Sequence, residues 1–293
     1  MASGAGRVGR DTGPMSPNLD SRTVEGFGKQ WSVFDQRDLA PAEQALLFQR
    51  YFRIFPWEQL PRPSVGADVG CGAGRWAALV APHAGRLYCF DASLAAARVA
   101  RESLRSLSNC AVGCASAERL PVPDGSLDFV YSLGVLHHLP DPAAAMRACA
   151  AKLKPGAPFL VYLYYALDNR PAWYRALWRM SDLVRRAVAV LPFPFRYALS
   201  QTIALLVYVP LARAARWLER RGRNVDRWPL SSYRKLSLYS IRTDALDRFG
   251  TRLERRFSAD QIRAMMGSAG LERIAFSSEV PYWCAIGYRS ALP

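Results

Sequence analysis

The segment Ala67-Asp-Val-Gly-Cys-Gly-Ala-Gly-Arg75 has the residue types and spacing that most clearly suggest chemistry. It joins a short apolar run to a helical pattern, and its glycines allow a tight turn in which backbone N–H groups approach a ligand closely. A dinucleotide-binding fingerprint, G-x-G-x-x-G, would need glycine where this chain has Arg75. Asp68, two residues before the first glycine, would repel a pyrophosphate and suits a cationic ligand.

A second acid, Asp91, ends the next predicted strand, about 20 residues after the loop. A carboxylate at that point can accept hydrogen bonds from both hydroxyls of a ribose. The loop and the two acids together describe a nucleoside that carries an amino group and no phosphate. S-adenosylmethionine fits this description.

Several segments together resemble the class I S-adenosylmethionine-dependent methyltransferases, in the group that includes quinone, small-molecule and sugar methyltransferases. Beyond the loop and Asp91 they are Ala117-Glu118-Arg-Leu-Pro-Val-Pro-Asp-Gly-Ser-Leu-Asp128, Leu133-Gly-Val-Leu-His-His138 and Leu153-Lys-Pro-Gly156. The resemblance covers about residues 65–165 and 258–288. It implies S-adenosylmethionine as the cofactor, with contacts from Asp68, Gly70, Cys71, Gly72, Gly74, Asp91, Ala92, Ser116, Ala117, Glu118 and Leu133.

One position departs from the family pattern. The family often has an Asp just before the Ala-Glu pair, where it bonds the adenine amino group, and this chain has Ser116. A serine hydroxyl accepts such a bond more weakly, so we expect binding to survive, with adenine held in part by the backbone near Ala117. The same departure favours an alternative, a non-catalytic protein that binds S-adenosylmethionine or a partner.

Methyl transfer from a sulfonium depends mostly on positioning and desolvation, and it requires no metal. A general base helps only where the acceptor is a hydroxyl or an acidic carbon. His138 is the first candidate for the base, and His137 is the second. The alternative is that the two histidines orient their loop. Tyr165, Tyr282 and Trp283 are the predicted acceptor-binding residues.

Strands alternate with helices along the body of the chain, which predicts an α/β fold with a doubly wound, mostly parallel sheet. The resemblance implies seven strands in the order 3-2-1-4-5-7-6. The strands predicted at Glu272 to Ser277 and Trp283 to Tyr288 have no helix between them, so the last strand is expected to be antiparallel. The fifth strand is predicted over Pro158 to Leu167, and a helical insert follows it.

The pattern divides the chain into a tail, a cap, a core and an insert. The predicted parts are a disordered tail at 1–24, an N-terminal helical cap at 25–62, the cofactor-binding core at 63–168, a basic helical insert at 169–257 and the end of the core at 258–293. Within the cap, the aromatic segment Phe27 to Phe34 either folds over the cofactor, with Gln30 or Trp31 near it, or packs on the body.

The insert carries nearly all of the net charge, because it holds 19 Arg and Lys against six acids while the whole chain has +15. Its stretch Tyr197 to Ala212 is uncharged over 16 residues, short of the roughly 20 that a spanning helix needs. Arginines follow directly. The pattern predicts a lid over the acceptor site, with peripheral contact to an anionic membrane or a homodimer interface as alternatives. Arg242, Arg255 and Arg256 either bind an anionic acceptor or pair with neighbouring acids.

Composition excludes several classes. The hydrophobic content of 51% excludes global disorder, and six cysteines without a CxxC pair, with three histidines, disfavour structural zinc and a disulfide framework. No metal site is expected. The start of the chain lacks an apolar signal region, so we expect a cytoplasmic protein, associated with a membrane if the insert contacts one.

The leading hypothesis is an S-adenosylmethionine-dependent methyltransferase that acts on a small-molecule or lipid-linked acceptor. An RNA methyltransferase that binds through the Arg-rich insert is the alternative enzyme. Nucleic acid is the less favoured partner, because no recognisable RNA-binding module is visible.

Overall fold

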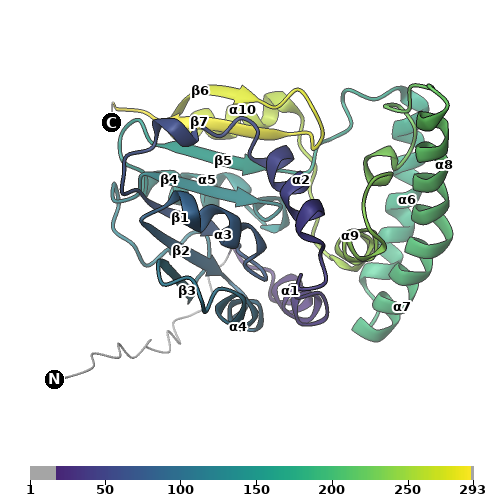
Figure 1. Ribbon diagram of the computed structural model, residues 1–293, viewed down its shortest axis with the longest axis horizontal. Coiled ribbons are helices and arrows are strands. Elements are labelled where there is room, and N and C mark those ends of the chain that lie inside the picture. The colour runs from purple at the N-terminus through teal and green to yellow at the C-terminus, as the bar shows by residue number, and fades with distance from the viewer. Residues whose placement is uncertain (1–17, 292–293) are drawn as a thin grey trace.

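The computed structural model describes residues 18–291, and at its centre lies one seven-stranded sheet (Figure 1). The strand order is β3-β2-β1-β4-β5-β7-β6, and β7 pairs antiparallel with both of its neighbours while the other pairs are parallel. The predicted order and the antiparallel last strand are confirmed. The strands are β1 (Val65–Val69), β2 (Arg86–Asp91), β3 (Cys110–Cys114), β4 (Phe129–Leu133), β5 (Pro158–Tyr162), β6 (Leu271–Phe276) and β7 (Cys284–Arg289).

The central strands are buried on both faces, as expected for parallel strands that helices cover on each side. Gly66 in β1 lies under the ring of Phe129 in β4, and a Cβ on Gly66 would come within 2.1 Å of the ring. Only glycine leaves space for that ring on the neighbouring strand. The tight packing fixes the ends of β1 and β4, where the glycine loop and the His pair begin.

Two apolar clusters, one on each face of the sheet, attach the core helices. α5 and α10 contribute Met146 and Met266 to one cluster, and α3 and α4 contribute Trp76 and Ala100 to the other. The helices are α1 (Ser21–Val33), α2 (Pro41–Tyr51), α3 (Arg75–Val80), α4 (Leu94–Ser103), α5 (Pro142–Ala151) and α10 (Ala259–Ser268), with 3₁₀ turns at Trp57–Gln59, Ala81–His83, Leu136–His138 and Ser231–Tyr233. The predicted capping box at Ser258 and Gln261 opens α10.

The insert forms a second layer of helices beside the sheet (Figure 1). α6 and the long helix made of α7 and α8 both pack on α9, which lies between them and α1. Buried residues such as Tyr208, Ile241 and Phe249 hold this layer together. Its helices are α6 (Ala172–Ala189), α7 (Phe193–Ile203), α8 (Val209–Arg220) and α9 (Leu238–Gly250).

α7 and α8 form one continuous helix across Pro210. A π-helical stretch, Ala204–Tyr208, joins them just before the proline. Proline has no N–H to donate to the preceding turn, and the wider π-helical turn makes room for its ring. By length and composition this helix, Phe193–Arg220, could cross a membrane, and 33% of its most apolar 18-residue window is buried in the protein. From the sequence, the uncharged run was expected to be too short to span a membrane. That expectation counted only the uncharged residues, whereas the whole helix has 28 residues.

The structure also moves some predicted boundaries. α1 begins at Ser21, capped by Asp20, so residues 21–24 are helical and not part of a disordered tail, while residues 1–17 lie outside the described residues. β5 ends at Tyr162. The chain beyond it forms a loop, in which Tyr165 makes one bridge with Phe257, and this loop brings the following tyrosines into the site.

Candidate functional site

A cavity of about 710 Å³ lies where the carboxyl ends of β1, β2, β4 and β5 meet α1, α2 and the insert. Ligands bind at this edge in doubly wound sheets, because the loops that follow the parallel strands converge there. The wall changes character along the cavity. Glycines and one carboxylate line it near β1 and β2, and tyrosines, arginines and three further aspartates line it near the insert.

Asp91 at the end of β2 organises the first part of the cavity. Its Oδ2 accepts a hydrogen bond from the Gly72 N–H at 2.9 Å, and its Oδ1 accepts one from the Ser93 N–H at 2.8 Å. Burial raises the pKa of Asp91. Gly70, Ala92 and Leu133 share the cavity wall with it, so four of the predicted cofactor residues converge on one space.

The glycine loop takes backbone conformations that favour glycine, with φ of +81° at Gly70, +54° at Gly72 and +82° at Gly74. The N–H groups of Gly70 and Cys71 donate to the Phe90 carbonyl, at 2.7 and 2.9 Å, which ties the loop to β2. Gly74 precedes α3 and packs on Leu104, and Cys71 is buried in the core.

Asp68 lies beneath the loop, 1% exposed. Its Oδ2 has no hydrogen-bond partner among the residues that the structure describes, and burial raises the pKa of Asp68 to about 8. A buried carboxyl oxygen without a donor, next to a loop of glycines, fits a site that a positively charged ligand completes. The buried Asp68 carboxyl, the glycine loop and the cavity wall at Asp91 together fit S-adenosylmethionine.

The adenine-side residues lie at the edge of this region. Ala117 accepts a hydrogen bond from Cys149 Sγ at 3.4 Å, and Glu118 accepts one from Asn18 Nδ2 at 2.6 Å. Ser116 precedes them in the turn after β3. The chain just before α1 therefore covers this side of the site, and its residues Leu19 and Asp20 line the cavity.

α1 forms a wall of the cavity through Thr23, Phe27, Gln30 and Trp31. It approaches the loops closely because Gly28 has no side chain, since a Cβ on Gly28 would lie 2.5 Å from Ser93 Oγ. Within the aromatic segment, Trp31 packs against Gly72 of the glycine loop, and Gln30 and Trp31 both line the cavity.

The His pair divides between the cavity wall and the interior. His138 lines the cavity, and its Nδ1 lies 2.7 Å from the Leu253 carbonyl. Burial lowers the pKa of His138 to about 4. Since the Nδ1 that faces a carbonyl must carry the proton, Nε2 is the acceptor in the neutral ring. Nε2 has no hydrogen-bond partner within residues 18–291.

His137 is fully buried behind this wall. It stacks on Tyr164 with ring centroids 3.9 Å apart, and burial puts its pKa well below the ordinary value. Neither ring nitrogen has a partner in the described part of the chain. Its position suits a residue that supports Tyr164.

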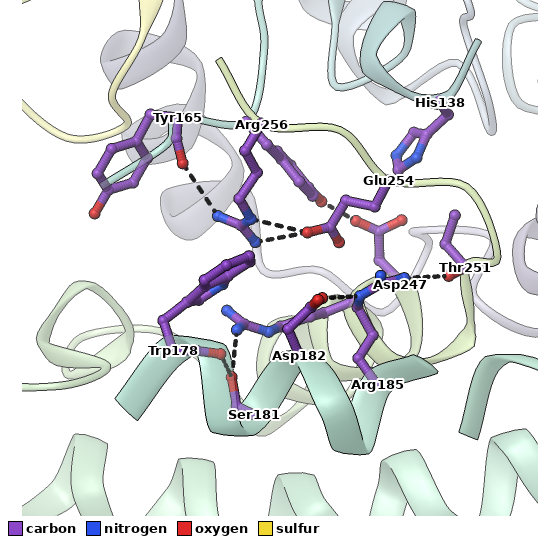
Figure 2. Close-up of polar contacts among 12 residues, drawn as sticks. His138, Tyr165, Trp178, Ser181, Asp182, Arg185, Asp247, Thr251, Glu254 and Arg256 are labelled. Atoms are coloured by element: carbon purple, nitrogen blue, oxygen red, sulfur yellow. Dashed lines mark hydrogen bonds and ion pairs between the residues drawn. The ribbon is translucent and has the colours of Figure 1, made fainter. Parts of the chain in front are cut away.

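A buried polar cluster joins the core to the insert, as Figure 2 shows. The Tyr164 hydroxyl donates to Asp247 of α9, and Arg256 pairs with Glu254 at 2.9 Å while lying over the Trp178 ring. Burial raises the pKa of Asp247 to about 6. Of the three arginines considered from the sequence, Arg256 therefore pairs with an acid.

The cluster continues into α6. Arg185 pairs with Asp182 at 2.6 Å and donates to the Thr251 carbonyl at 3.1 Å (Figure 2). Both side chains are almost wholly buried. These bonds fix α6 against the end of α9, so that Tyr174 and Trp178 of α6 are held in the cavity wall.

The predicted acceptor residues lie together. Tyr165 and Tyr282 both line the cavity with ring centroids 5.5 Å apart, and Arg170 lies over the Tyr282 ring. Trp283 packs behind them on Tyr165 and Phe276. Arg242 bonds to Gln201 and Tyr197, and the Arg255 N–H donates to the His137 carbonyl.

Several wall residues were missed from the sequence. From the sequence, Arg50 and Tyr51 were assigned only to a helical cap, Arg234 only to the basic insert, and Asp244 and Asp247 to ion pairs. The i, i+3 spacing of the two aspartates on one helix was a usable signal. Within residues 18–291, no group of three or more His, Cys, Asp or Glu side chains is arranged to hold a metal.

Comparison with known proteins agrees with this geometry. Residues 67–161 match a family model described as "Methyltransferase domain". Ubiquinone biosynthesis O-methyltransferase from Ralstonia nicotianae is 39% identical over 123 residues, covering 40% of this chain and 49% of that protein. The protein of the same name from Xanthomonas campestris pv. campestris is 38% identical over 107 residues, covering 36% and 44%. The chain thus spans about half the length, or less, of these curated relatives.

Among solved structures, an S-adenosylmethionine-dependent methyltransferase from Methanosarcina mazei is similar to 80% of this chain and 95% of its own, at 15% identity and a TM-score of 0.48. A similarity at that level carries no argument about activity. The family match covers the glycine loop, Asp91 and the His pair, and the observed strand order is the one that the family resemblance implied. Residues 67–161 of this chain are thus similar to a methyltransferase domain, and this part of the core holds the glycine loop, Asp91 and the His pair.

Proposed function

We propose that the protein transfers the methyl group of S-adenosylmethionine to a hydroxyl of a small-molecule or lipid-linked acceptor. The observation that carries the proposal is one continuous cavity. It joins Gly70 and Asp91, where the family binds its cofactor, to an aromatic wall around Tyr165 and Tyr282. The O-methyltransferase relatives support oxygen as the acceptor atom.

The residues present fit the cofactor. Asp91 would accept hydrogen bonds from the ribose hydroxyls, Ala92 and Leu133 would pack on the adenine, and the chain around Ser116, Ala117 and Glu118 would border it. The glycine loop, including Cys71, Gly72 and Gly74, would face the methionine portion. Asp68 beneath the loop would offset its positive charge. When bound, S-adenosylmethionine supplies an activated methyl group, so the protein's main tasks are to orient the acceptor and exclude water.

His138 is the proposed general base. In this cavity-lining ring Nε2 is the unprotonated acceptor, because Nδ1–H is held by the Leu253 carbonyl. With a pKa lowered to about 4 by burial, the ring is neutral at physiological pH and would accept a hydroxyl proton as a weak base. Phe27 covers the ring at 4.9 Å between centroids and limits access of water. His137 acts through Tyr164, as a positioning residue.

The insert is proposed to serve as the lid over the acceptor. Tyr174 and Trp178 of α6, the segment that holds Trp228 and Tyr233, and Asp247 of α9 all line the cavity. The acceptor would lie among these rings, with Tyr165 and Tyr282 opposite and Trp283 supporting them.

The outer face of the insert is proposed to rest on an anionic membrane from the cytoplasmic side. α6 and α7–α8 bury their inner faces on α9, which leaves apolar side chains outside, including Met180 and Leu183 at 67% and Leu206 at 71% exposure. Trp217 is half exposed, and Arg221 stacks on it at 3.8 Å. An apolar face bordered by aromatic and arginine side chains matches the chemistry of an anionic lipid surface.

The proposed activity is tested by two measurements on the purified full chain. Calorimetric titration with S-adenosylhomocysteine, beside NADH as a control, should show binding of the first alone. Incubation with methyl-labelled S-adenosylmethionine and a panel of phenols and catechols should transfer label to at least one acceptor. Binding without transfer to any phenol, catechol or lipid-linked phenol would favour the non-catalytic alternative. Transfer to RNA only would contradict the proposed substrate class.

A further inference from the structure

Two arginines from distant parts of the chain face the same cavity. Arg50 lies in the last turn of α2, and Arg234 follows the 3₁₀ turn Ser231–Tyr233 of the insert. The positive charge of Arg234 lowers the pKa of Arg50, in addition to the larger effect of burial. The two guanidinium groups are therefore close enough to repel each other.

The Arg50 side chain has neither a hydrogen bond nor an ion pair with any residue in 18–291. Arg234 donates to Glu219 at 2.9 Å and to the Ser231 carbonyl at 2.9 Å, but its Nε is buried without a partner among the described residues. A partly buried cation that lacks an acceptor, beside a second cation, is unfavourable unless an anion completes the site.

The acids near this pair are engaged elsewhere. Glu279 pairs with Arg53, Asp247 accepts from Tyr164, and Asp244 is buried, with its pKa raised to about 6. None of these cavity-lining acids is bonded to Arg50 or Arg234.

The position of Arg50 and Arg234 indicates that the anion completing their site belongs to the methyl acceptor. Arg234 belongs to the insert, which lines the acceptor half of the cavity. Arg75, which opens α3 beside the glycine loop and bonds to Gln36 at 3.1 Å, is the cation nearer the cofactor side. Next to Arg50, the ring of Tyr51 packs on Tyr162 at 5.1 Å and on Trp76 at 5.0 Å. An anionic group and an aromatic or apolar body would both be accommodated.

We propose that Arg50 and Arg234 form an anion subsite that holds a phosphate or carboxylate of the methyl acceptor. The subsite rests on the proposed function, since it identifies a feature of the acceptor. The chemistry is charge-assisted hydrogen bonding from two guanidinium groups, which suits planar or tetrahedral oxyanions.

The test is calorimetry on the full chain saturated with S-adenosylhomocysteine, with phenyl phosphate and phenol as matched probes. We expect phenyl phosphate to bind at least about tenfold tighter than phenol. Arg50→Gln should remove that preference, whereas Arg98→Gln, an exposed arginine of α4 outside the cavity, should keep it. Arg234→Gln should weaken phenyl phosphate similarly, and because it also loses the Glu219 ion pair, Arg50→Gln is the decisive variant.

Each outcome has one meaning. Equal binding of phenol and phenyl phosphate to the wild-type complex overturns the subsite. So does binding of phenyl phosphate that S-adenosylhomocysteine abolishes, because the arginines would then hold the cofactor's own carboxylate. Failure to bind S-adenosylhomocysteine itself would overturn the proposed function instead. Farnesyl phosphate distinguishes a lipid-linked anion from a compact aromatic anion. If it binds more tightly than phenyl phosphate, the anion is lipid-linked, and if it binds more weakly, the anion is a compact aromatic one.

Discussion

The indole of Trp31 in α1 lies directly on Gly72 of the glycine loop. A Cβ placed on Gly72 would come within 2.8 Å of Trp31 Cε2, and Trp31 also lines the cavity. The helix that begins the described chain thus closes the cofactor end of the site. Removing the ring in Trp31→Ala would open that wall to water, so we expect S-adenosylhomocysteine to bind about tenfold more weakly. Titration calorimetry measures this, with Trp217→Ala on the outer face of the insert as the control, and unchanged affinity would mean that α1 does not cover the bound cofactor.

Asp91 should be the residue on which cofactor binding depends most. The variant Asp91→Ala removes the proposed ribose acceptor and the acceptor of the Gly72 and Ser93 N–H groups. Loss of charge-assisted hydrogen bonds predicts at least about a 100-fold weaker affinity for S-adenosylhomocysteine. The matched control is Asp124→Ala, whose side chain is 72% exposed. A circular dichroism spectrum like that of the wild type, combined with wild-type affinity, would refute the site assignment.

Replacement of His138 should affect catalysis and leave the cofactor in place. For His138→Gln we expect kcat to fall by about 10²-fold or more, because the side chain can no longer accept the hydroxyl proton at Nε2. The measurement is methyl transfer to whichever phenol or catechol the wild-type protein accepts, together with calorimetry to show retained cofactor binding. His83→Gln, at an exposed position, serves as the control. A change confined to KM would indicate that His138 positions the acceptor without taking its proton.

The raised pKa of Asp244 predicts a pH-dependent stability. Burial raises the pKa of its carboxyl from 3.8 to about 6, so between about pH 4 and 6 the folded protein holds a proton that the unfolded chain releases. The free energy of unfolding therefore decreases as pH rises through that window and does not recover above it. Asp244→Asn removes the buried charge, and we expect it to stabilise the protein by about 1–2 kcal/mol at pH 7.5 and hardly at all at pH 4.

Urea unfolding at a series of pH values measures this difference. Asp124→Asn, at an exposed aspartate, should change stability little at either pH. A stabilisation by Asp244→Asn that is the same at pH 4 and pH 7.5 would show that the carboxyl is not desolvated in the folded protein.

The outer face of the insert predicts binding to anionic vesicles. The double variant Met180→Glu, Leu206→Glu places two charges on that face, at side chains 67% and 71% exposed. We expect the wild-type protein to sediment with phosphatidylserine-containing vesicles and not with purely zwitterionic ones, and the double variant to stay in solution. Val33→Glu, on α1 and 47% exposed, is the control. A wild-type protein that does not sediment and is dimeric by light scattering would assign the face to a second copy of the chain.

Much of the core could be predicted from the sequence, because the signals are local. The glycine loop needs positive φ at Gly70 and Gly72, the strands are short apolar runs between turns, and Asp91 closes a strand. Each of these constraints acts within a few residues. The two last strands could be expected to pair antiparallel because no helix separates them.

Other features depended on contacts between distant segments. The placement of Trp31 over Gly72 requires α1 to pack on α4, and Tyr164, two residues beyond the end of β5, donates a hydrogen bond to Asp247 of the insert. Helical periodicity reports which residues face a core, but it does not report which polar residue faces a cavity.

Two examples show the limit. His137 and His138 are adjacent and identical in type, and both lie in the 3₁₀ turn Leu136–His138, yet of the two only His138 lines the cavity. Arg50 and Arg234 lie in separate parts of the chain, and neither belongs to a recognisable motif. The sequence by itself determined the strands, the loop and the cofactor class, since these follow from local conformation and a short motif, and the order of the strands followed from the family resemblance. Only the tertiary structure decided which charges share the acceptor space, since that depends on how the insert packs against the sheet.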